Sequence, residues 1–115
     1  MPGVVVKRIE KVLGSLKRKQ IFLIGMTYKP NVVDIRESPS ISIARLLIKK
    51  GAFVSYHDPF ISTITIPETN LTHQSLTMRR LKQADLIVIL TPHKRIAWKK
   101  IRQFKRKILD TRGSL

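Results

Sequence analysis

The chain has 115 residues, 43% of them hydrophobic, and a formal net charge of +16. This length suits one compact domain with its own core and leaves no room for two. The sequence contains no cysteine, which excludes disulfides, thiolate metal ligands and a cysteine nucleophile within these residues. No apolar run approaches the roughly 18 residues of a membrane span, and no signal-peptide pattern opens the chain, so we expect a cytoplasmic protein.

The excess positive charge is concentrated in two segments. The first holds Lys7, Arg8, Lys11, Lys17, Arg18 and Lys19, and the second holds Lys94, Arg95, Lys99, Lys100, Arg102, Lys105, Arg106 and Lys107. Such a field attracts anions of any kind, nucleic acid included. A solvated basic surface without a partner is the more frequent explanation, because basic patches alone often give false matches to nucleic-acid binding. We therefore do not expect a nucleic-acid partner.

The first expected element is an amphipathic helix over residues 4–16. Its apolar positions recur at about 3.6-residue spacing. They are Val5, Ile9, Val12, Leu13 and Leu16. A helix of this kind needs a partner surface to cover its apolar face.

The second expected unit is a strand, a long loop and a helix. The apolar run 21–24 predicts a strand buried on both faces, and Ser38 and Pro39 are typical of a helix start. Helical spacing then predicts a buried stripe that ends before Gly51 and comprises Ile41, Ala44, Leu47 and Ile48. The intervening loop of about a dozen residues is twice the usual length, which favours a functional role.

The rest of the chain continues the alternation. We expect strands over residues 53–57, 86–90 and 108–109, with helices over 78–83 and 94–103. Asp58 and Pro59 end the first of these strands. Residues 60–77 are polar and threonine-rich, which predicts an irregular connection with a short extended piece at 64–66.

Alternating strands and helices indicate an α/β fold, a three-layer Rossmann-like open parallel sheet in a single domain with an N-terminal helix. The loops after the first, third and fourth strands then share one edge of the sheet, where such folds bind ligands. The candidate functional residues on these loops are Tyr28, Lys29, Arg36, Thr91, His93, Asp110 and Arg112.

Three cations near a helix start suggest a site for a phosphate or diphosphate, because Lys supplies a point charge and Arg a planar set of donors. They are Lys29, Arg36 and Arg112. Alternatively, Lys29 and Arg36 pair with Asp34 and Glu37 and only hold the loop together. The residues alone leave both possibilities open.

Other polar residues carry weaker signals. Asp58 stands where a dinucleotide fold has its acidic ribose ligand, but a single glycine follows the first strand and the G-x-G-x-x-G turn is missing. We therefore interpret Asp58 as a turn residue. The histidines lack metal-ligand spacing, so we expect structural or surface roles and no metal. Trp98, within a basic helix, is expected to be partly buried.

Several motifs together resemble one known family. They are Gly25-Met26-Thr27-Tyr28-Lys29-Pro30, Asp34-Ile35-Arg36-Glu37-Ser38-Pro39, Asp58-Pro59, Ala84-Asp85, Thr91-Pro92-His93 and Asp110-Thr111-Arg112. In order and spacing they resemble the C-terminal domain of the UDP-glucose/GDP-mannose dehydrogenase family. The resemblance implies that residues 1–19 correspond to the end of the family's central helix with a linker, and 20–115 to its UDP-binding domain.

The resemblance implies a nucleotide-sugar-binding domain of an NAD-dependent UDP-sugar 6-dehydrogenase, an oxidoreductase of polysaccharide biosynthesis that converts the sugar C6 alcohol to a carboxylate. It assigns Tyr28, Lys29 and Arg112 to substrate binding and Arg36 to the cofactor. Other domains would bind most of the NAD and supply the catalytic cysteine, so the chain alone is expected to be inactive. The implied partners are a UDP-sugar and the rest of the enzyme or a homo-oligomer. The alternatives are a basic anion- or nucleic-acid-binding module, or a structural or dimerisation remnant, on the same fold.

Overall fold

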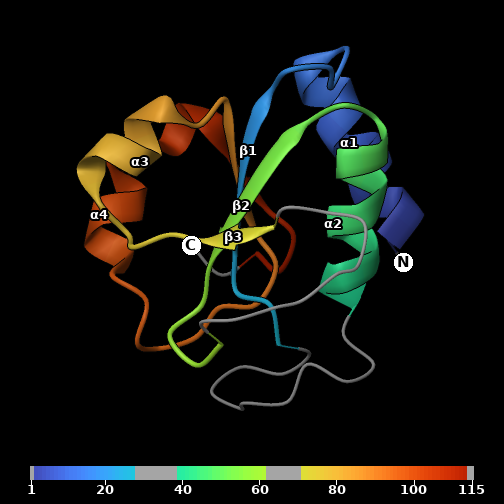
Figure 1. The fold of residues 1–115 in the computed structure, drawn as a ribbon. Coiled ribbons are helices and arrows are strands. Elements are labelled where there is room, and N and C mark those ends of the chain that lie inside the picture. Colours follow the sequence, from blue (N-terminus) through green and yellow to red (C-terminus); the bar gives the residue numbers. More distant parts are fainter. Residues whose placement is uncertain (1, 28–38, 62–70, 114–115) are drawn as a thin grey trace.

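A five-stranded parallel sheet with strand order β3-β2-β1-β4-β5 forms the middle layer of the molecule (Figure 1). The computed structural model describes residues 2–27, 39–61 and 71–113. The strands are β1 (Gln20–Ile24), β2 (Phe53–His57), β3 (Thr72–His73), β4 (Leu86–Ile89) and β5 (Ile108–Asp110). The helices are α1 (Pro2–Leu13), α2 (Pro39–Lys49), α3 (Met78–Gln83) and α4 (Trp98–Arg102), with a 3-10 turn η1 (Lys105–Lys107). The predicted three-layer Rossmann-like class is confirmed.

The two central strands are apolar along both faces. β1 and β4 pair from Ile21 opposite Leu86 to Ile24 opposite Ile89, and all eight of these paired positions are buried. A strand covered on both faces tolerates no alternation of polar residues, which explains the continuous apolar runs in the sequence.

One face of the sheet is covered by α1 and α2. Val6 and Ile9 of α1 and Ile43, Ala44 and Leu47 of α2 share one core with β1, β2 and β4. The expected stripes were confirmed at most positions, since Ile9, Leu16, Ala44 and Leu47 are buried in this core and Val5, Leu13 and Ile48 are partly buried against it. Val12 is 58% exposed, and in α2 Ile43 is buried where Ile41 was expected and remains partly buried. These are errors at single positions, because the other predicted positions of both stripes face the core.

The opposite face is covered by α3, α4 and η1 (Figure 1). Phe22 and Ile24 of β1 pack there with Leu81 of α3 and Ile101 of α4. The Lys107 ammonium donates to the carbonyls of Lys82 and Ala84, at 2.9 and 2.7 Å, and so closes the carboxyl end of α3. Part of the positive charge in this layer is thus used to hold the layer together.

Some element boundaries differ from those predicted. α1 begins at Pro2 and ends at Leu13, not at residue 16, and Gly14 takes a positive φ of 76° directly after it. α4 begins only at Trp98, because the loop before it turns back on itself through the His93 and Ile96 backbone. Trp98 is partly buried, as expected.

The connection predicted as irregular contains a strand. Thr72 and His73 form β3, which pairs with Ser55 and Tyr56 of β2. Two residues are too few to show an alternating pattern, so the sequence could not reveal this edge strand. The extended piece expected at 64–66 lies outside the described residues.

The strand order places a topological switch at the centre of the sheet. From β1 the chain moves outward to β2 and β3, then returns across the sheet to β4 and continues to β5. The loops after β1 and β4 therefore leave in opposite directions, and a crevice opens between them at the carboxyl edge. Among the described residues, no helix is both long and apolar enough to cross a membrane.

Candidate functional site

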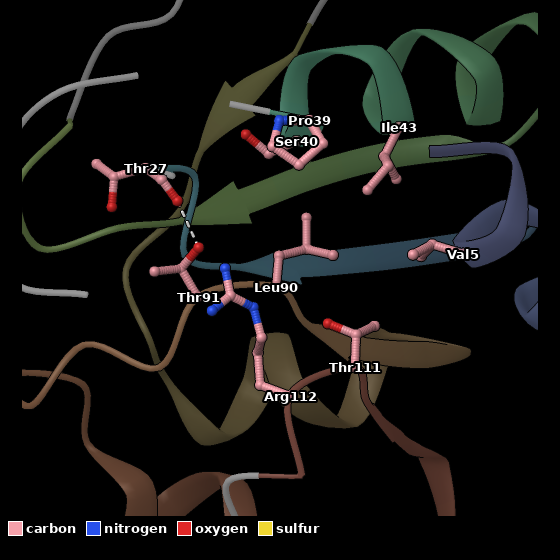
Figure 2. A pocket seen from close by; sticks show the side chains of 9 residues that line it. All are labelled: Val5, Thr27, Pro39, Ser40, Ile43, Leu90, Thr91, Thr111 and Arg112. Atoms are coloured by element: carbon pink, nitrogen blue, oxygen red, sulfur yellow. Dashed lines mark hydrogen bonds between the residues drawn. The ribbon is translucent and has the colours of Figure 1, made fainter. Parts of the chain in front are cut away.

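A cavity of about 240 Å3 opens at this switch point (Figure 2). Its wall combines part of α1, the segment after β1, the start of α2 and the segments after β4 and β5. The lining residues are Val5, Thr27, Pro39, Ser40, Ile43, Leu90, Thr91, Thr111 and Arg112. We call it the edge cavity.

The first turn of α2 faces the edge cavity. Pro39 fits the first helical position, where its missing N–H costs nothing. The Ser40 hydroxyl donates to the Met26 carbonyl at 2.5 Å, which fixes this turn against the end of β1. The N–H groups at a helix start are not used inside the helix, so this wall of the cavity presents partial positive charge.

Arg112 brings a full positive charge to the same cavity. The residue is exposed, and its side chain reaches from the end of β5 toward Thr91 (Figure 2). The Asp110 carboxylate accepts from the Arg112 backbone N–H at 3.1 Å, and the Thr111 hydroxyl donates to the Ile89 carbonyl at 2.6 Å. These bonds hold the turn after β5 next to the end of β4.

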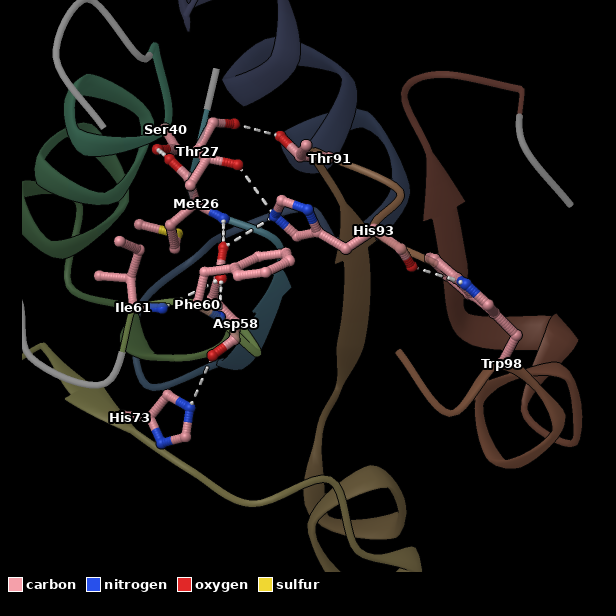
Figure 3. Close-up of polar contacts among 10 residues, drawn as sticks. All are labelled: Met26, Thr27, Ser40, Asp58, Phe60, Ile61, His73, Thr91, His93 and Trp98. Atoms are coloured by element: carbon pink, nitrogen blue, oxygen red, sulfur yellow. Dashed lines mark hydrogen bonds and ion pairs between the residues drawn. The ribbon is translucent and has the colours of Figure 1, made fainter. Parts of the chain in front are cut away.

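Beside the cavity lies a buried, hydrogen-bonded group that we call the tip cluster: Met26, Thr27, Asp58, Thr91 and His93, of which Thr27 and Thr91 also line the cavity (Figure 3). The Asp58 Oδ2 atom accepts from the Met26 N–H at 2.6 Å and lies 3.1 Å from His93 Nε2. His93 Nε2 also lies 2.9 Å from Thr27 Oγ1, and the Thr91 hydroxyl donates to the Thr27 carbonyl. The cluster joins the ends of β1, β2 and β4.

This geometry excludes a hydrolase-type triad. In such a triad the hydroxyl binds one imidazole nitrogen, which takes its proton. The carboxylate binds the other nitrogen and holds the ring in place. Here the Asp58 and Thr27 oxygens both lie against His93 Nε2. The Thr27 hydroxyl is also buried and bonded within the cluster, so it is not placed to act as a nucleophile. The tip cluster holds the ends of the strands together and is not a catalytic triad.

Burial is the main cause of the pKa shifts of two nearby groups, Tyr56 and His57. Burial, and secondarily the negative charge of Asp58, raise the pKa of the Tyr56 phenol. Burial also lowers the pKa of His57, and His73 lowers it further, while the hydrogen bond to the Gln74 carbonyl and the Asp58 charge oppose the shift. In the described part of the chain no three His, Asp or Glu side chains gather as a metal site would require.

The predicted site residues are only partly within the described chain. Arg112 and Thr91 line the edge cavity, as the shared-edge argument expected, whereas His93 lies behind it. Tyr28, Lys29 and Arg36 lie outside the described residues, so their predicted roles stay predictions.

Comparison with known proteins decides the family. A model of the UDP binding domain of the UDP-glucose/GDP-mannose dehydrogenase family matches residues 22–115. The chain belongs to this family.

Individual relatives agree with that assignment. A UDP-glucose 6-dehydrogenase of Rickettsia conorii is 34% identical over 109 residues, which cover 87% of this chain and 25% of that protein. A UDP-N-acetyl-D-mannosamine dehydrogenase of Methanococcus maripaludis is 36% identical over 95 residues, covering 81% and 21%. The chain thus spans about a quarter of the length of the curated relatives it matches.

Solved structures give the same picture. The UDP-N-acetyl-mannosamine dehydrogenase Cap5O from Staphylococcus aureus superposes with a TM-score of 0.72 at 29% identity, over 97% of this chain and 27% of that one. A UDP-glucose dehydrogenase from Pyrobaculum islandicum gives 0.70 at 27% identity, over 95% and 25%. The domain therefore has the fold of the corresponding part of these enzymes.

The described residues of the domain do not fit the diphosphate of NAD in the manner of a dinucleotide fold. That manner needs several glycines after the first strand, so that the backbone can approach the phosphates. Here Gly25 serves a different contact, since a Cβ atom at this position would lie 2.1 Å from the Thr91 carbonyl oxygen. Gly25 allows the ends of β1 and β4 to meet.

Sequence reasoning missed several residues of this site. Thr27, Ser40 and Thr111 line the cavity but were not selected, although Thr27 and Thr111 lie beside candidates that were and Ser40 directly follows the motif that ends at Pro39. Asp58 was interpreted as a turn residue, and its Oδ1 atom does accept from the Phe60 and Ile61 N–H groups at 2.7 and 3.2 Å. Its second role, toward Met26, spans 32 positions and leaves no local signal.

Proposed function

We propose that the edge cavity binds the diphosphate of UDP or of a UDP-sugar, as part of an NAD-dependent dehydrogenase that oxidises the sugar C6 alcohol to a carboxylate. One observation carries the proposal: the start of α2, three threonines and Arg112 meet at the switch point of the sheet. The membership of the domain in a UDP-binding family supports it.

The chemistry of the wall suits a diphosphate. A helix start offers backbone N–H donors and partial positive charge, and α2 is long enough, at 11 residues, to have a developed dipole. The Arg112 guanidinium offers a planar set of donors that matches two phosphate oxygens at once. We expect Lys29, assigned to the substrate by the family resemblance, to add a second cation.

The size of the cavity limits what it holds. Pockets that bury whole drug-sized ligands typically have about 300–1,000 Å3. The edge cavity, at about 240 Å3, therefore suits the diphosphate rather than the complete nucleotide sugar. The uridine and the sugar would extend beyond it.

We assign binding and orientation, rather than the oxidation step, to this domain. The sequence contains no cysteine to act as nucleophile and no glycine-rich dinucleotide turn. NAD, when bound by the complete enzyme, would accept the hydride. Purified 115-residue chain should form no NADH from any UDP-sugar.

Calorimetric titration with UDP at moderate salt tests the proposal. Loss of a charge-assisted hydrogen bond costs about 1.5–3 kcal/mol, so Arg112→Ala should weaken UDP binding roughly ten- to more than a hundredfold. Lys105→Ala is the matched control, because Lys105 is an exposed cation on η1, away from the cavity. Equal losses in the two variants would contradict the proposal.

A second candidate function, the binding of nucleic acid, rests on the positive charge of residues 78–107, which include α3, α4 and η1. Residues 78–107 carry eleven Lys and Arg side chains against one acidic residue, Asp85. An open hollow of about 430 Å3 at the α4–η1 corner is lined by Arg102, Gln103, Phe104, Lys105, Arg106 and Lys107. We call residues 78–107 the basic layer. Tighter binding of duplex DNA than of UDP at physiological salt would favour this candidate over the first.

A further inference from the structure

Asp58 and His93 lie directly behind the edge cavity without lining it. Their side chains are fully buried, so neither can touch a ligand in the cavity. Both contact Thr27, Thr91 or the backbone next to them. We infer that Asp58 and His93 are positioning residues, which set Thr27 and Thr91 at the geometry that nucleotide diphosphate binding requires. The inference rests on the proposed function of the edge cavity.

Asp58 extends the connection between β1 and β2 beyond the end of their backbone pairing. The register of these strands ends where Ile24 lies opposite His57, followed by one bond from the Gly25 N–H to the His57 carbonyl. The next donor along β1 is the Met26 N–H, which binds Asp58 Oδ2 at 2.6 Å. A side chain thus takes over where the ladder stops, immediately before Thr27.

Asp58 is itself held rigidly. Its Oδ1 atom accepts from the N–H groups of Phe60 and Ile61, and its backbone carbonyl lies 3.2 Å from His73 Nε2 (Figure 3). Every one of these partners can donate, so both carboxylate oxygens act as acceptors. A buried carboxylate with this many donors has one orientation, which is the property a positioning residue needs.

His93 fixes Thr27 from the side of β4. Its Nε2 atom lies 2.9 Å from Thr27 Oγ1 and 3.1 Å from Asp58 Oδ2. Since Asp58 accepts, the arrangement requires the tautomer in which Nε2 carries the proton. The Thr91 hydroxyl, two positions earlier in the same loop, donates to the Thr27 carbonyl. Thr27 is therefore held at both its side chain and its backbone.

His93 is also held from behind. The Trp98 indole N–H donates to the His93 carbonyl at 3.0 Å, and the Phe60 ring packs edge-on against the imidazole with the ring centroids 4.9 Å apart. Binding sites need their contacting atoms within about 0.5 Å of the productive geometry, which supporting residues of this kind supply. The loss of the His93 hydrogen bonds should therefore weaken diphosphate binding through Thr27 and Thr91.

The test compares His93→Gln with His93→Leu. Glutamine keeps an N–H donor near the place of Nε2, whereas leucine fills similar space without one. We expect His93→Leu to weaken UDP binding about tenfold or more, and His93→Gln to remain within about threefold of the original chain. Leu81→Ala, which opens a cavity in the opposite core away from the site, should lower stability yet leave UDP affinity unchanged.

Amide NMR spectra supply a second readout that needs no ligand. Both His93 variants lose the imidazole ring current, so a difference between their spectra reports the hydrogen bonds alone. We expect the Thr27 and Thr91 amide signals to move in His93→Leu and to return toward their original positions in His93→Gln. If His93→Leu does not fold, Asp58→Asn replaces it, because asparagine keeps the volume but has one acceptor oxygen instead of two, so either the Met26 N–H or the Phe60 and Ile61 N–H groups lose their acceptor.

The outcomes separate the two proposals. Failure of the unaltered chain to bind UDP overturns the proposed function, and the amide signals then decide the positioning role without it. Equal UDP affinities of His93→Gln and His93→Leu, with unchanged Thr27 and Thr91 signals, would overturn the positioning role even if UDP binds. A loss of affinity in Leu81→Ala as large as in His93→Leu would also overturn it.

Discussion

The carboxyl edge of the sheet and the basic layer differ in how their polar groups are used. At the edge, a few polar side chains are buried and bonded to one another, as in the pair of Asp58 and His93 with both side chains fully buried. In the basic layer most cations are exposed, while Lys107 donates to the Lys82 and Ala84 carbonyls of the same layer and Lys100 donates to the Leu76 carbonyl just before it. The candidate site lies where a few polar groups from separate strands converge. The number of charged residues in a region does not indicate where the site is.

The largest expected effect concerns the close approach of β1 and β4 at the edge. Gly25→Ala should lower the free energy of unfolding by more than about 4 kcal/mol, because the new methyl group would collide with the Thr91 carbonyl. Gly14→Ala is the matched control, since Gly14 also has positive φ but nothing within 4 Å of the added Cβ. It should cost only about 1–2 kcal/mol. Urea unfolding measures the free energy of unfolding of both variants. Similar losses in the two would show that β1 and β4 do not approach closely at Gly25.

Asp58→Ala tests whether the buried polar group is as important as its contacts indicate. Removing one partner of a buried pair leaves donors without acceptors and costs about 3–5 kcal/mol. Asp85→Ala is the control, because Asp85 is exposed and accepts from the Gln20 N–H at 2.7 Å. There we expect about 1 kcal/mol. If thermal or urea unfolding shows the same loss of unfolding free energy in both variants, the buried carboxylate is no more important for stability than the exposed one.

Within the basic layer, Lys107 and Lys105 allow a cation that binds backbone carbonyls to be compared with an exposed one. Lys107→Met loses the donor to the Lys82 and Ala84 carbonyls and should cost about 1 kcal/mol of unfolding free energy. Lys105→Met changes an exposed cation and should stay within about 0.5 kcal/mol of the original chain. If Lys105→Met destabilises as much as Lys107→Met, the exposed cations are not merely solvated.

The smallest expected effect is a pH dependence at His57. Burial, aided by His73, lowers the pKa of His57 below its ordinary value of 6.5, so the unfolded chain binds the proton more readily than the folded one. The contribution is fully present above pH 6.5 and is lost as the pH falls below that value. The unfolding free energy should decline less steeply in His57→Gln than in the original chain between about pH 7 and 5. A steeper decline in the variant would contradict this account.

Much of the fold could be predicted from the sequence because its central elements have strong patterns. β1 and β4 are continuous apolar runs, and α3 was predicted with its observed bounds, Met78–Gln83. β3 was missed because a strand of two residues has no periodicity. The buried face of α1 was predicted correctly apart from Val12, which was taken for a buried residue and is exposed.

The site could be predicted only where it follows from topology. Parallel strands bring all carboxyl ends to one edge, so Thr91 and Arg112 were placed correctly without any contact being known. The partnership of Asp58 with Met26 and His93 depends on where side chains from three strands meet. Nothing in the local sequence distinguishes such an aspartate from an ordinary turn residue, which Asp58 also is.

Titration of the isotope-labelled chain with UDP, followed by amide NMR, tests the central claim most directly. If the edge cavity is the nucleotide site, the signals of Thr27, Ser40, Thr91, Thr111 and Arg112 should move with one common affinity, while those of α4 and η1 stay in place. Movement confined to the residues around the α4–η1 hollow, with the edge cavity unchanged, would contradict the account.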